Sequence, residues 1–147
     1  MELPRYHRLR GPLYQLEGSR CEGCGELRFP ARPFCTVCKS GESRPHRFKG
    51  AGTLWSFSEL YQLQRGHPKD VPHLVGLVKL DEGPMLLAQI TDAEPQDLSI
   101  GMRVQMVTRL IRAIGESGYR VYGYKFRPVL EPALDSPGSS PKTVSDR

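Results

Sequence analysis

The residues with the clearest chemical potential are four cysteines, which lie within eighteen residues of one another. They form two C-x-x-C pairs separated by ten residues: Cys21 with Cys24, and Cys35 with Cys38. In each pair the second sulfur folds back beside the first, so the two pairs offer four thiolates to one ion. This spacing predicts one structural Zn²⁺ ion, with Zn–S bonds of about 2.3 Å.

Two other chemistries fit the same cysteines. Iron binds in the same four-sulfur cage, and two disulfides would suit a small secreted domain. The first residues lack the apolar core of a signal peptide. The sequence therefore favours zinc in a reducing cytoplasm. Because four cysteines fill the coordination sphere of the ion, we expect the site to be structural rather than catalytic.

The rest of the sequence carries no recognisable catalytic motif, such as a G-x-S-x-G elbow or an H-E-x-x-H pair. With every cysteine assigned to the metal, no thiol remains to attack a thioester. His73 near Asp70 could form a dyad, but a loop histidine before a strand explains it better. Asp81 and Glu82 belong to a D-E-G-P sequence that is typical of a hairpin turn. We therefore predict that the chain has no catalytic residue of its own.

The cysteines lie in the N-terminal third of the chain, so short elements in that part must position them. Residues 1–16 are basic and are interrupted by Pro4 and Pro12, which predicts an extended docking arm with room for one helical turn. This arm could pack on the metal-binding segment or dock another subunit. Residues 17–49 are expected to form a zinc ribbon. The hairpin between its cysteine pairs contains three apolar residues: Leu27, Phe29 and Phe34.

Residues 50–130 indicate β structure throughout. Apolar alternation and intervening turn residues predict five strands, over residues 53–63, 73–80, 85–91, 100–114 and 119–129. Five strands with no strong helix between them are most economically closed as a barrel of the OB type. A plain antiparallel sheet or an SH3-like barrel fits almost as well. Residues 131–147 are rich in proline and serine, which predicts a tail that is disordered or becomes ordered only against a partner.

The positive charge of the chain is concentrated near its N-terminus. Residues 1–49 hold ten Lys and Arg against five Asp and Glu, whereas residues 50–147 hold eleven of each. An anionic partner should therefore be drawn to the ribbon and arm. Arg28 and Arg32 are solvated turn charges or phosphate contacts, because arginine presents a forked donor to such groups. Three arm residues lie behind them: Arg5, Arg8 and Arg10. No apolar run approaches the ~18 residues of a membrane span.

The order of these motifs resembles that of a known family. The matching segments are residues 18–21 at the first cysteine pair, 28–33 before the second, 50–57 at the start of the barrel, 73–83 in its first hairpin and 100–104 at the entry of its fourth strand. Over about residues 13–130 the chain is similar to acyl-CoA-associated proteins that join a rubredoxin-like zinc ribbon to a C-terminal OB-fold.

The resemblance implies a function that the spacing of residues does not. Members of this family are usually non-catalytic small subunits of thiolases or thiolase-like enzymes, as in the benzoylsuccinyl-CoA, sterol side-chain and acetoacetyl-CoA systems. Some accompany acyl-CoA hydratases or aldolases. The resemblance thus implies a hetero-oligomer whose partner carries the catalytic Cys and His, with acyl-CoA at the subunit interface. Arg28 and Arg32 would then lie toward the CoA phosphates.

The main rival function is binding of single-stranded nucleic acid, because zinc ribbons and OB-folds also occur in such proteins. Residues 50–130 hold nine Lys and Arg against eight Asp and Glu, which attracts a polyanion only weakly. The candidate stacking rings fall on predicted strands: Trp55, Phe57, Tyr122, Tyr124 and Phe126. We expect exposed rings, and the apolar hairpin at Leu86 and Leu87, to contact a protein partner instead.

Overall fold

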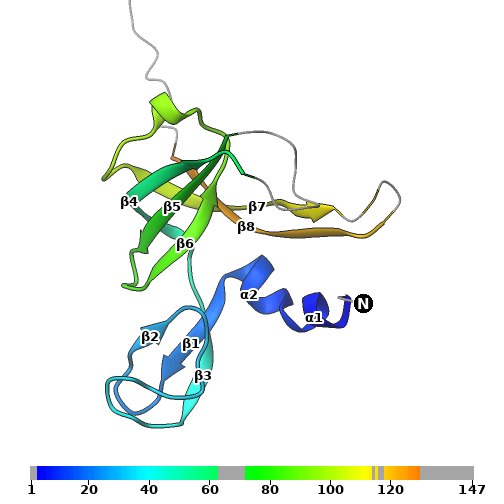
Figure 1. Ribbon diagram of the computed structural model, residues 1–147. Helices are drawn as coiled ribbons and strands as arrows, with labels where there is room; N and C mark the ends of the chain where they lie inside the picture. The colour runs from blue at the N-terminus through cyan, green and yellow to red at the C-terminus, as the bar shows by residue number, and fades with distance from the viewer. Residues whose placement is uncertain (1–2, 63–71, 114, 116–117, 130–147) are drawn as a thin grey trace, which may run out of the picture.

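The computed structural model describes residues 3–62, 72–113, 115 and 118–129. Within this part of the chain, two short helices precede a three-stranded ribbon and a five-stranded closed barrel (Figure 1). The predicted mainly β fold, a zinc ribbon followed by a five-stranded barrel, is confirmed. The tail predicted over residues 131–147 lies outside the described residues. None of the helices in the described part has the length and apolar character needed to cross a membrane.

The ribbon is a small antiparallel sheet in the order β2-β1-β3. Its strands are β1 (Glu17–Cys21), β2 (Leu27–Arg28) and β3 (Ser43–Arg47). β1 pairs with β3 along its whole length, and Ser19 lies opposite Arg28 of β2. A Cβ atom on Gly18 would overlap the carbonyl oxygen of Arg28, so glycine is required where β1 lies against β2.

The barrel contains β4 (Ala51–Leu60), β5 (His73–Leu80), β6 (Met85–Ile90), β7 (Arg103–Ala113) and β8 (Arg120–Pro128). A 3-10 turn, η1 (Pro95–Asp97), lies between β6 and β7. The strand order is β4-β5-β6-β8-β7, and β7 returns to pair with β4. All pairs are antiparallel except β6 with β8, where Ile90 lies opposite Phe126. This closure is the OB topology rather than an open sheet or an SH3-like barrel.

The five strands match their predicted positions closely, except at the start of β7. That strand was expected from residue 100 but begins at Arg103. The preceding residues form a turn in which the Met102 N–H donates to the Ser99 carbonyl at 3.2 Å. Gly101 has a φ of 91° there, a conformation that glycine adopts without strain.

The N-terminal arm is helical, which corrects the extended arm that we predicted. It forms α1 (Leu3–Arg8) and α2 (Arg10–Gln15). Pro4 and Pro12 each lie in the first turn of a helix, where backbone N–H groups have no partner within the helix and proline is tolerated. Leu16 caps the C-terminus of α2: its N–H donates to the Gly11 carbonyl, and its left-handed φ of 48° turns the chain out of the helix.

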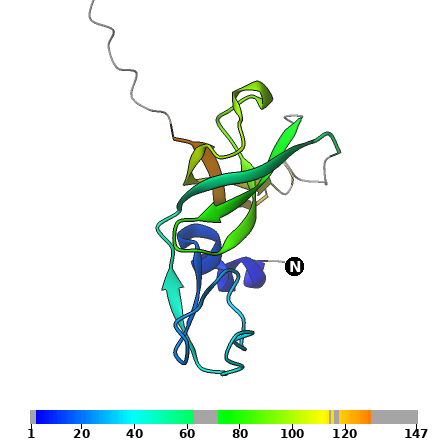
Figure 2. The same cartoon turned by 90° about the vertical axis from the view of Figure 1, so that its left-hand side faces the viewer.

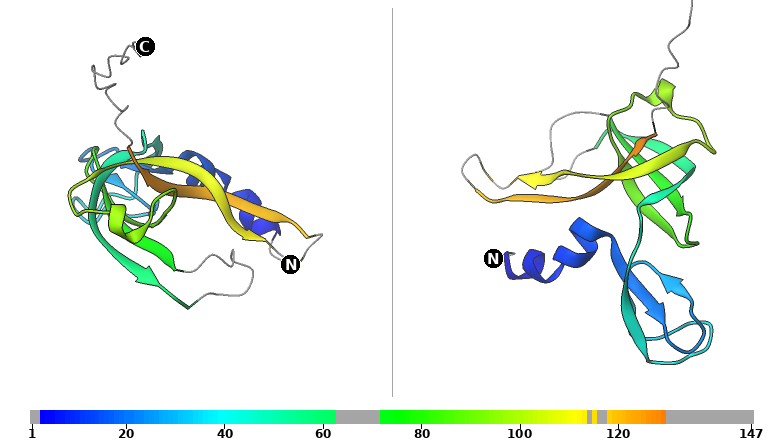
Figure 3. Two further views of the ribbon diagram at one scale, coloured as in Figure 1. Left: turned by 90° about the horizontal axis from the view of Figure 1, so that it is seen from above. Right: turned by 180° about the vertical axis from the view of Figure 1, so that it is seen from behind.

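The two helices lie along β8, beside the part of the β7–β8 pair that extends beyond the barrel (Figures 1 and 3). The rings of Tyr6 and Tyr119 are 6.2 Å apart, and a Cβ atom on Gly123 would lie 3.3 Å from the Leu13 side chain. The arm therefore packs on the β7–β8 pair, and α2 also contacts β1 of the ribbon. The three arginines of the arm are exposed: Arg5, Arg8 and Arg10.

The ribbon and the barrel share one hydrophobic core. Leu16 and Phe48, at the two ends of the ribbon, are buried in the same cluster as barrel residues such as Leu54 and Phe126. The backbone of Lys49 donates a hydrogen bond of 2.8 Å to Glu82, in the turn between β5 and β6. The chain passes from β3 into β4 along one side of the molecule (Figure 2). This packing fixes the ribbon beside the barrel.

Candidate metal centre and neighbouring surfaces

Each cysteine pair lies in a tight turn of the same construction. The Cys21 N–H donates to the Glu26 carbonyl at 2.9 Å, and the Cys35 N–H donates to the Ser40 carbonyl at 2.8 Å. In both turns the N–H of the first cysteine donates to the carbonyl of the residue five positions further along the chain. β1 ends at Cys21 and therefore delivers the first turn, whereas the second turn lies in the loop between β2 and β3.

The residue after each pair adopts a left-handed backbone conformation. Gly25 has a φ of 74° and Lys39 a φ of 60°. Three glycines lie in or near the two turns, Gly23, Gly25 and Gly41, and only Gly25 among them has a positive φ. Gly23 serves a different purpose, since a Cβ atom there would lie 3.3 Å from the Cys38 sulfur. Lys39 takes the position that glycine fills in the first turn.

The two turns bring all four sulfurs together. Their Sγ atoms lie within 4.8 Å of one another. The Cys21 and Cys38 sulfurs are 3.4 Å apart, as are those of Cys24 and Cys35. Around a tetrahedral ion with bonds of about 2.3 Å the sulfurs would be about 3.8 Å apart, close to this arrangement. A disulfide needs about 2.05 Å, and the four cysteines are free, which argues against the disulfide alternative.

The turns favour the thiolate form that a metal requires at the first cysteine of each pair, whereas the neighbouring sulfurs raise the pKa of Cys38 and raise that of Cys24 to about 12. The backbone N–H of Cys38 donates to the Cys35 sulfur at 3.5 Å, and this hydrogen bond lowers the pKa of Cys35 to about 6. The backbone N–H of Cys24 lowers the pKa of Cys21 in the same way. Cys21 and Cys35 are buried, whereas Cys24 and Cys38 are exposed. The set is a closed four-sulfur site with one buried ligand from each turn.

The two arginines predicted to meet CoA have different surroundings. Arg28 turns toward the metal centre: it donates to the Phe34 carbonyl at 2.7 Å and to the Cys35 sulfur at 3.0 Å. Arg32 is exposed, and it lines a groove of about 280 Å³ between the ribbon and the β5–β6 turn. The hydrogen bonds of Arg28 could not be found from sequence, because they depend on how β2 approaches the second cysteine pair.

Comparison with known proteins agrees with this architecture. Residues 10–44 match the ChsH2 rubredoxin-like zinc ribbon domain, and residues 46–109 match the ChsH2 C-terminal OB-fold domain. A DUF35 domain-containing scaffold protein of Pyrococcus furiosus is 41% identical over 131 residues, which cover 89% of this chain and 96% of that protein. The chain belongs to the DUF35 family. Its four cysteines are therefore the zinc site of a family zinc ribbon.

Other relatives of this DUF35 chain carry the names of enzyme subunits. The benzoylsuccinyl-CoA thiolase subunit BbsA of Thauera aromatica is 30% identical over 114 residues, which cover 78% of this chain and 76% of that protein. Among solved structures, the Ltp2-ChsH2(DUF35) aldolase superposes with a TM-score of 0.65 at 25% identity, covering 86% of this chain and 93% of that one. The family thus comprises scaffold and accessory proteins with a zinc ribbon.

The candidate stacking rings divide into buried and exposed ones in the DUF35 barrel. Phe126 is completely buried, and Tyr124 packs against the core. Trp55 is 53% exposed, and the Lys79 ammonium lies 5.4 Å from the centre of its ring. In the predicted apolar hairpin, Leu86 is buried in the barrel. The exposed apolar residues of β6 are Met85 and Leu87.

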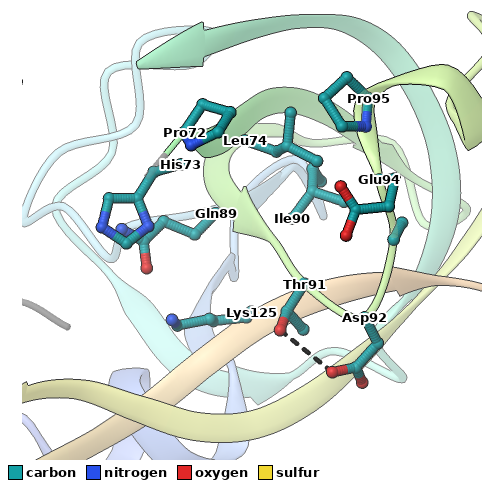
Figure 4. Close-up of a pocket in the computed structure, with 11 residues that line it drawn as sticks. Pro72, His73, Leu74, Gln89, Ile90, Thr91, Asp92, Glu94, Pro95 and Lys125 are labelled. Carbon is teal, nitrogen blue, oxygen red and sulfur yellow. Dashed lines mark hydrogen bonds between the residues drawn. The ribbon is translucent and has the colours of Figure 1, made fainter. Parts of the chain in front are cut away.

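Sequence reasoning missed a pocket of about 280 Å³ on the barrel of this DUF35 chain (Figure 4). His73 begins β5 and lines this pocket together with Lys125 of β8, which is 9% exposed. Asp92 lies on the same pocket; it accepts a hydrogen bond from Thr91 at 3.2 Å and one from Arg109 at 2.8 Å. The pocket therefore carries charges of both signs. The dyad considered for His73 involves Asp70, which lies outside the described residues.

Proposed function

We propose that this chain is a non-catalytic, zinc-binding small subunit of a hetero-oligomeric thiolase or thiolase-like complex that acts on acyl-CoA. The observation that carries the proposal is the similarity to a thiolase subunit along more than three quarters of both chains. The subunit holds the complex together and borders the CoA or acyl site. We propose the cytoplasm as its compartment, because metal-bound thiolates persist under reducing conditions.

The composition of the metal centre supports a non-catalytic subunit. All four cysteines of the chain belong to the zinc ribbon, and a zinc ion with four cysteine ligands keeps no open position for substrate. The nucleophile for acyl transfer must then come from the partner. In thioester chemistry that nucleophile is commonly a cysteine activated by a neighbouring base.

An exposed apolar surface on the barrel supports docking of the partner there. We call this surface the β4–β6 face and define it by three exposed side chains, Trp55, Met85 and Leu87, with the Lys79 side chain lying over the Trp55 ring. Leu77 of β5 links the two outer strands, because it pairs with Ser56 of β4 and with Leu87 of β6. Large aromatic and methionine side chains in one exposed patch are typical of subunit interfaces.

The groove beside Arg32 supports contact with CoA. Met85 lies both in this groove and on the β4–β6 face, so a partner seated on that face would border the groove. The charged residues that line the groove are Arg28, Arg32 and one acidic residue, Glu26. The guanidinium of Arg28 is engaged by the ribbon, so we assign the CoA phosphate contact to Arg32.

A second candidate function is accessory subunit of an aldolase or a hydratase. The aldolase structure described above, which contains a ChsH2(DUF35) chain, favours this alternative. Binding of single-stranded nucleic acid has less support, because Phe126 is buried and the barrel pocket carries mixed charges. Stacking on bases needs exposed rings along a positive groove.

Affinity purification of the tagged full chain from its native host tests the proposed function. We expect a thiolase-family enzyme to co-purify in a fixed ratio, identified by mass spectrometry and by size-exclusion chromatography. Leu87→Asp should release that partner, since it places a charge on the β4–β6 face. Tyr122→Ser, on the β7–β8 pair, is the matched control and should retain it. Recovery of an aldolase or a hydratase would support the second candidate, and recovery of the chain without any enzyme would contradict both.

Kinetics of the complex test the role of Arg32. Arg32→Gln is expected to raise KM for acyl-CoA several-fold, because it removes a phosphate contact, and to leave kcat nearly unchanged. Arg44→Gln removes the same charge from an exposed position on β3 and is the matched control. An unchanged KM for Arg32→Gln in the intact complex would contradict the assignment.

A further inference from the structure

The side chain of Arg28 spans from β2 to the second cysteine turn. Its Nη1 atom donates to the Phe34 carbonyl at 2.7 Å, and its Nη2 atom lies 3.0 Å from both the Cys35 sulfur and the Thr36 hydroxyl. One guanidinium thus contacts three consecutive residues of the loop that supplies half of the metal ligands. The backbone of Arg28 is fixed as well, because β2 pairs with β1 and the Arg28 carbonyl lies against Gly18.

The chemistry of a four-cysteine site gives these contacts a purpose. Four thiolates around one Zn²⁺ ion leave a net double negative charge on the cluster. Hydrogen bonds from a charged donor to such a group are stronger than neutral ones. Groups that bond to ligand atoms orient the ligands and tune the metal. Arginine suits this position because it stays protonated and offers several N–H donors in a fixed plane.

We propose that Arg28 is a positioning residue of the metal centre: it holds the Cys35 thiolate and the second cysteine turn in the geometry that binds the ion, and it offsets part of the charge of the cluster. The proposal goes beyond the proposed function, because it concerns the metal centre and does not depend on the partner or on CoA. It also separates the two neighbouring arginines, with Arg28 serving the metal and Arg32 facing the groove.

Three variants of the full, zinc-loaded chain test this proposal. Arg28→Gln removes the charge and shortens the donor. Arg28→Lys keeps the charge but cannot reach three acceptors at once. Arg44→Gln removes the same charge from an exposed position on β3. Zinc release to an excess of a chromogenic chelator is expected to be about tenfold faster for Arg28→Gln. The Arg44→Gln rate should equal that of the unmodified chain, and Arg28→Lys should fall between them.

A spectroscopic measurement distinguishes tuning of the sulfur from a general loss of stability. In the Co²⁺-substituted chain, a hydrogen bond to a thiolate lowers the energy of its lone pairs. Losing that bond should therefore move the sulfur-to-cobalt charge-transfer band to longer wavelength in Arg28→Gln. The band should stay in place in Arg44→Gln. If Arg28→Gln matches the unmodified chain in release rate and band position, the proposal is wrong. If Arg28→Gln does not fold, Arg28→Lys decides, and behaviour identical to the unmodified chain would overturn the proposal.

Discussion

The ring of Phe29 meets the ring of Tyr124 edge to face, with ring centroids 5.5 Å apart and an interplanar angle of 82°. Phe29 lies between the two cysteine pairs, and Tyr124 lies on β8 of the barrel. Phe29 also meets Phe48 edge to face, at 6.2 Å. The segment whose ends are fixed by the metal ligands is therefore also the segment that packs on the barrel wall.

Removing the Phe29 ring should weaken the whole fold. We expect Phe29→Ala to lower the free energy of unfolding by about 2–3 kcal/mol, because it deletes a partly buried ring that contacts two others. Phe34→Ala is the matched control, since Phe34 is in the same segment but 68% exposed; it should change stability by less than about 0.5 kcal/mol. Urea unfolding followed by the fluorescence of Trp55, the single tryptophan, measures both. Equal effects of the two substitutions would contradict this prediction.

Removal of the metal should unfold the ribbon. Metal analysis of the full chain is expected to find about one zinc ion per chain, and Cys35→Ser should abolish this binding. Val37→Ser changes an exposed residue of the same turn and should keep the ion. After chelation, limited proteolysis should cut between β1 and β3. A metal-free chain that resists the protease as well as the zinc-loaded one would count against this prediction, and bound iron would revive the alternative metal.

The ion pair between Arg103 and Asp81 should make stability depend on acid pH. Arg103 donates two hydrogen bonds to Asp81, at 2.6 and 2.7 Å, and thereby holds the pKa of Asp81 below its usual value. The stabilisation is present above the unfolded-state pKa of about 3.9, and it is lost as the pH falls through the lower folded-state pKa. Because both side chains are about half exposed, it should amount to less than about 1 kcal/mol.

Comparison with Asp81→Asn isolates this ion pair, because zinc loss in acid affects both proteins alike. The difference in free energy of unfolding between the unmodified chain and Asp81→Asn should shrink toward zero as the pH is lowered from 7 into this acid range. The control is the same comparison in Arg103→Gln, where the ion pair is already absent: Arg103→Gln is measured with and without Asp81→Asn. A difference that stays constant over this range would show that the ion pair does not contribute.

The metal ligands and the barrel could be predicted because their signals are local. The two cysteine pairs need only their own turns to converge, and each barrel strand carries its own apolar alternation. The residues that connect these units were not visible in the same way. Leu16 and Phe48 are isolated apolar residues at the ends of the ribbon, and their burial depends on contacts with the barrel. Such long-range contacts leave no periodic pattern in a sequence.

The helical arm shows how one signal can be given too much weight. Pro4 and Pro12 argued against helix, yet both fall in first turns, where proline costs little. The contact of Leu13 with Gly123 then stabilises helices that are too short to persist by themselves. Lys39 shows a signal that is missing from the sequence. Its backbone is left-handed, but lysine, unlike glycine, does not indicate a left-handed position.

The burial of Leu16 and Phe48 also suggests an order of events during translation. The loop between Cys21 and Cys38 closes within eighteen residues, whereas β4 must wait for β7, about fifty residues later in the chain. Residues 1–49 leave the ribosome first, so we expect the nascent ribbon to capture its ion before the barrel exists. It would then present both apolar side chains as a seed for the strands that follow. Zinc supply at the moment of synthesis would thus limit the yield of the folded chain.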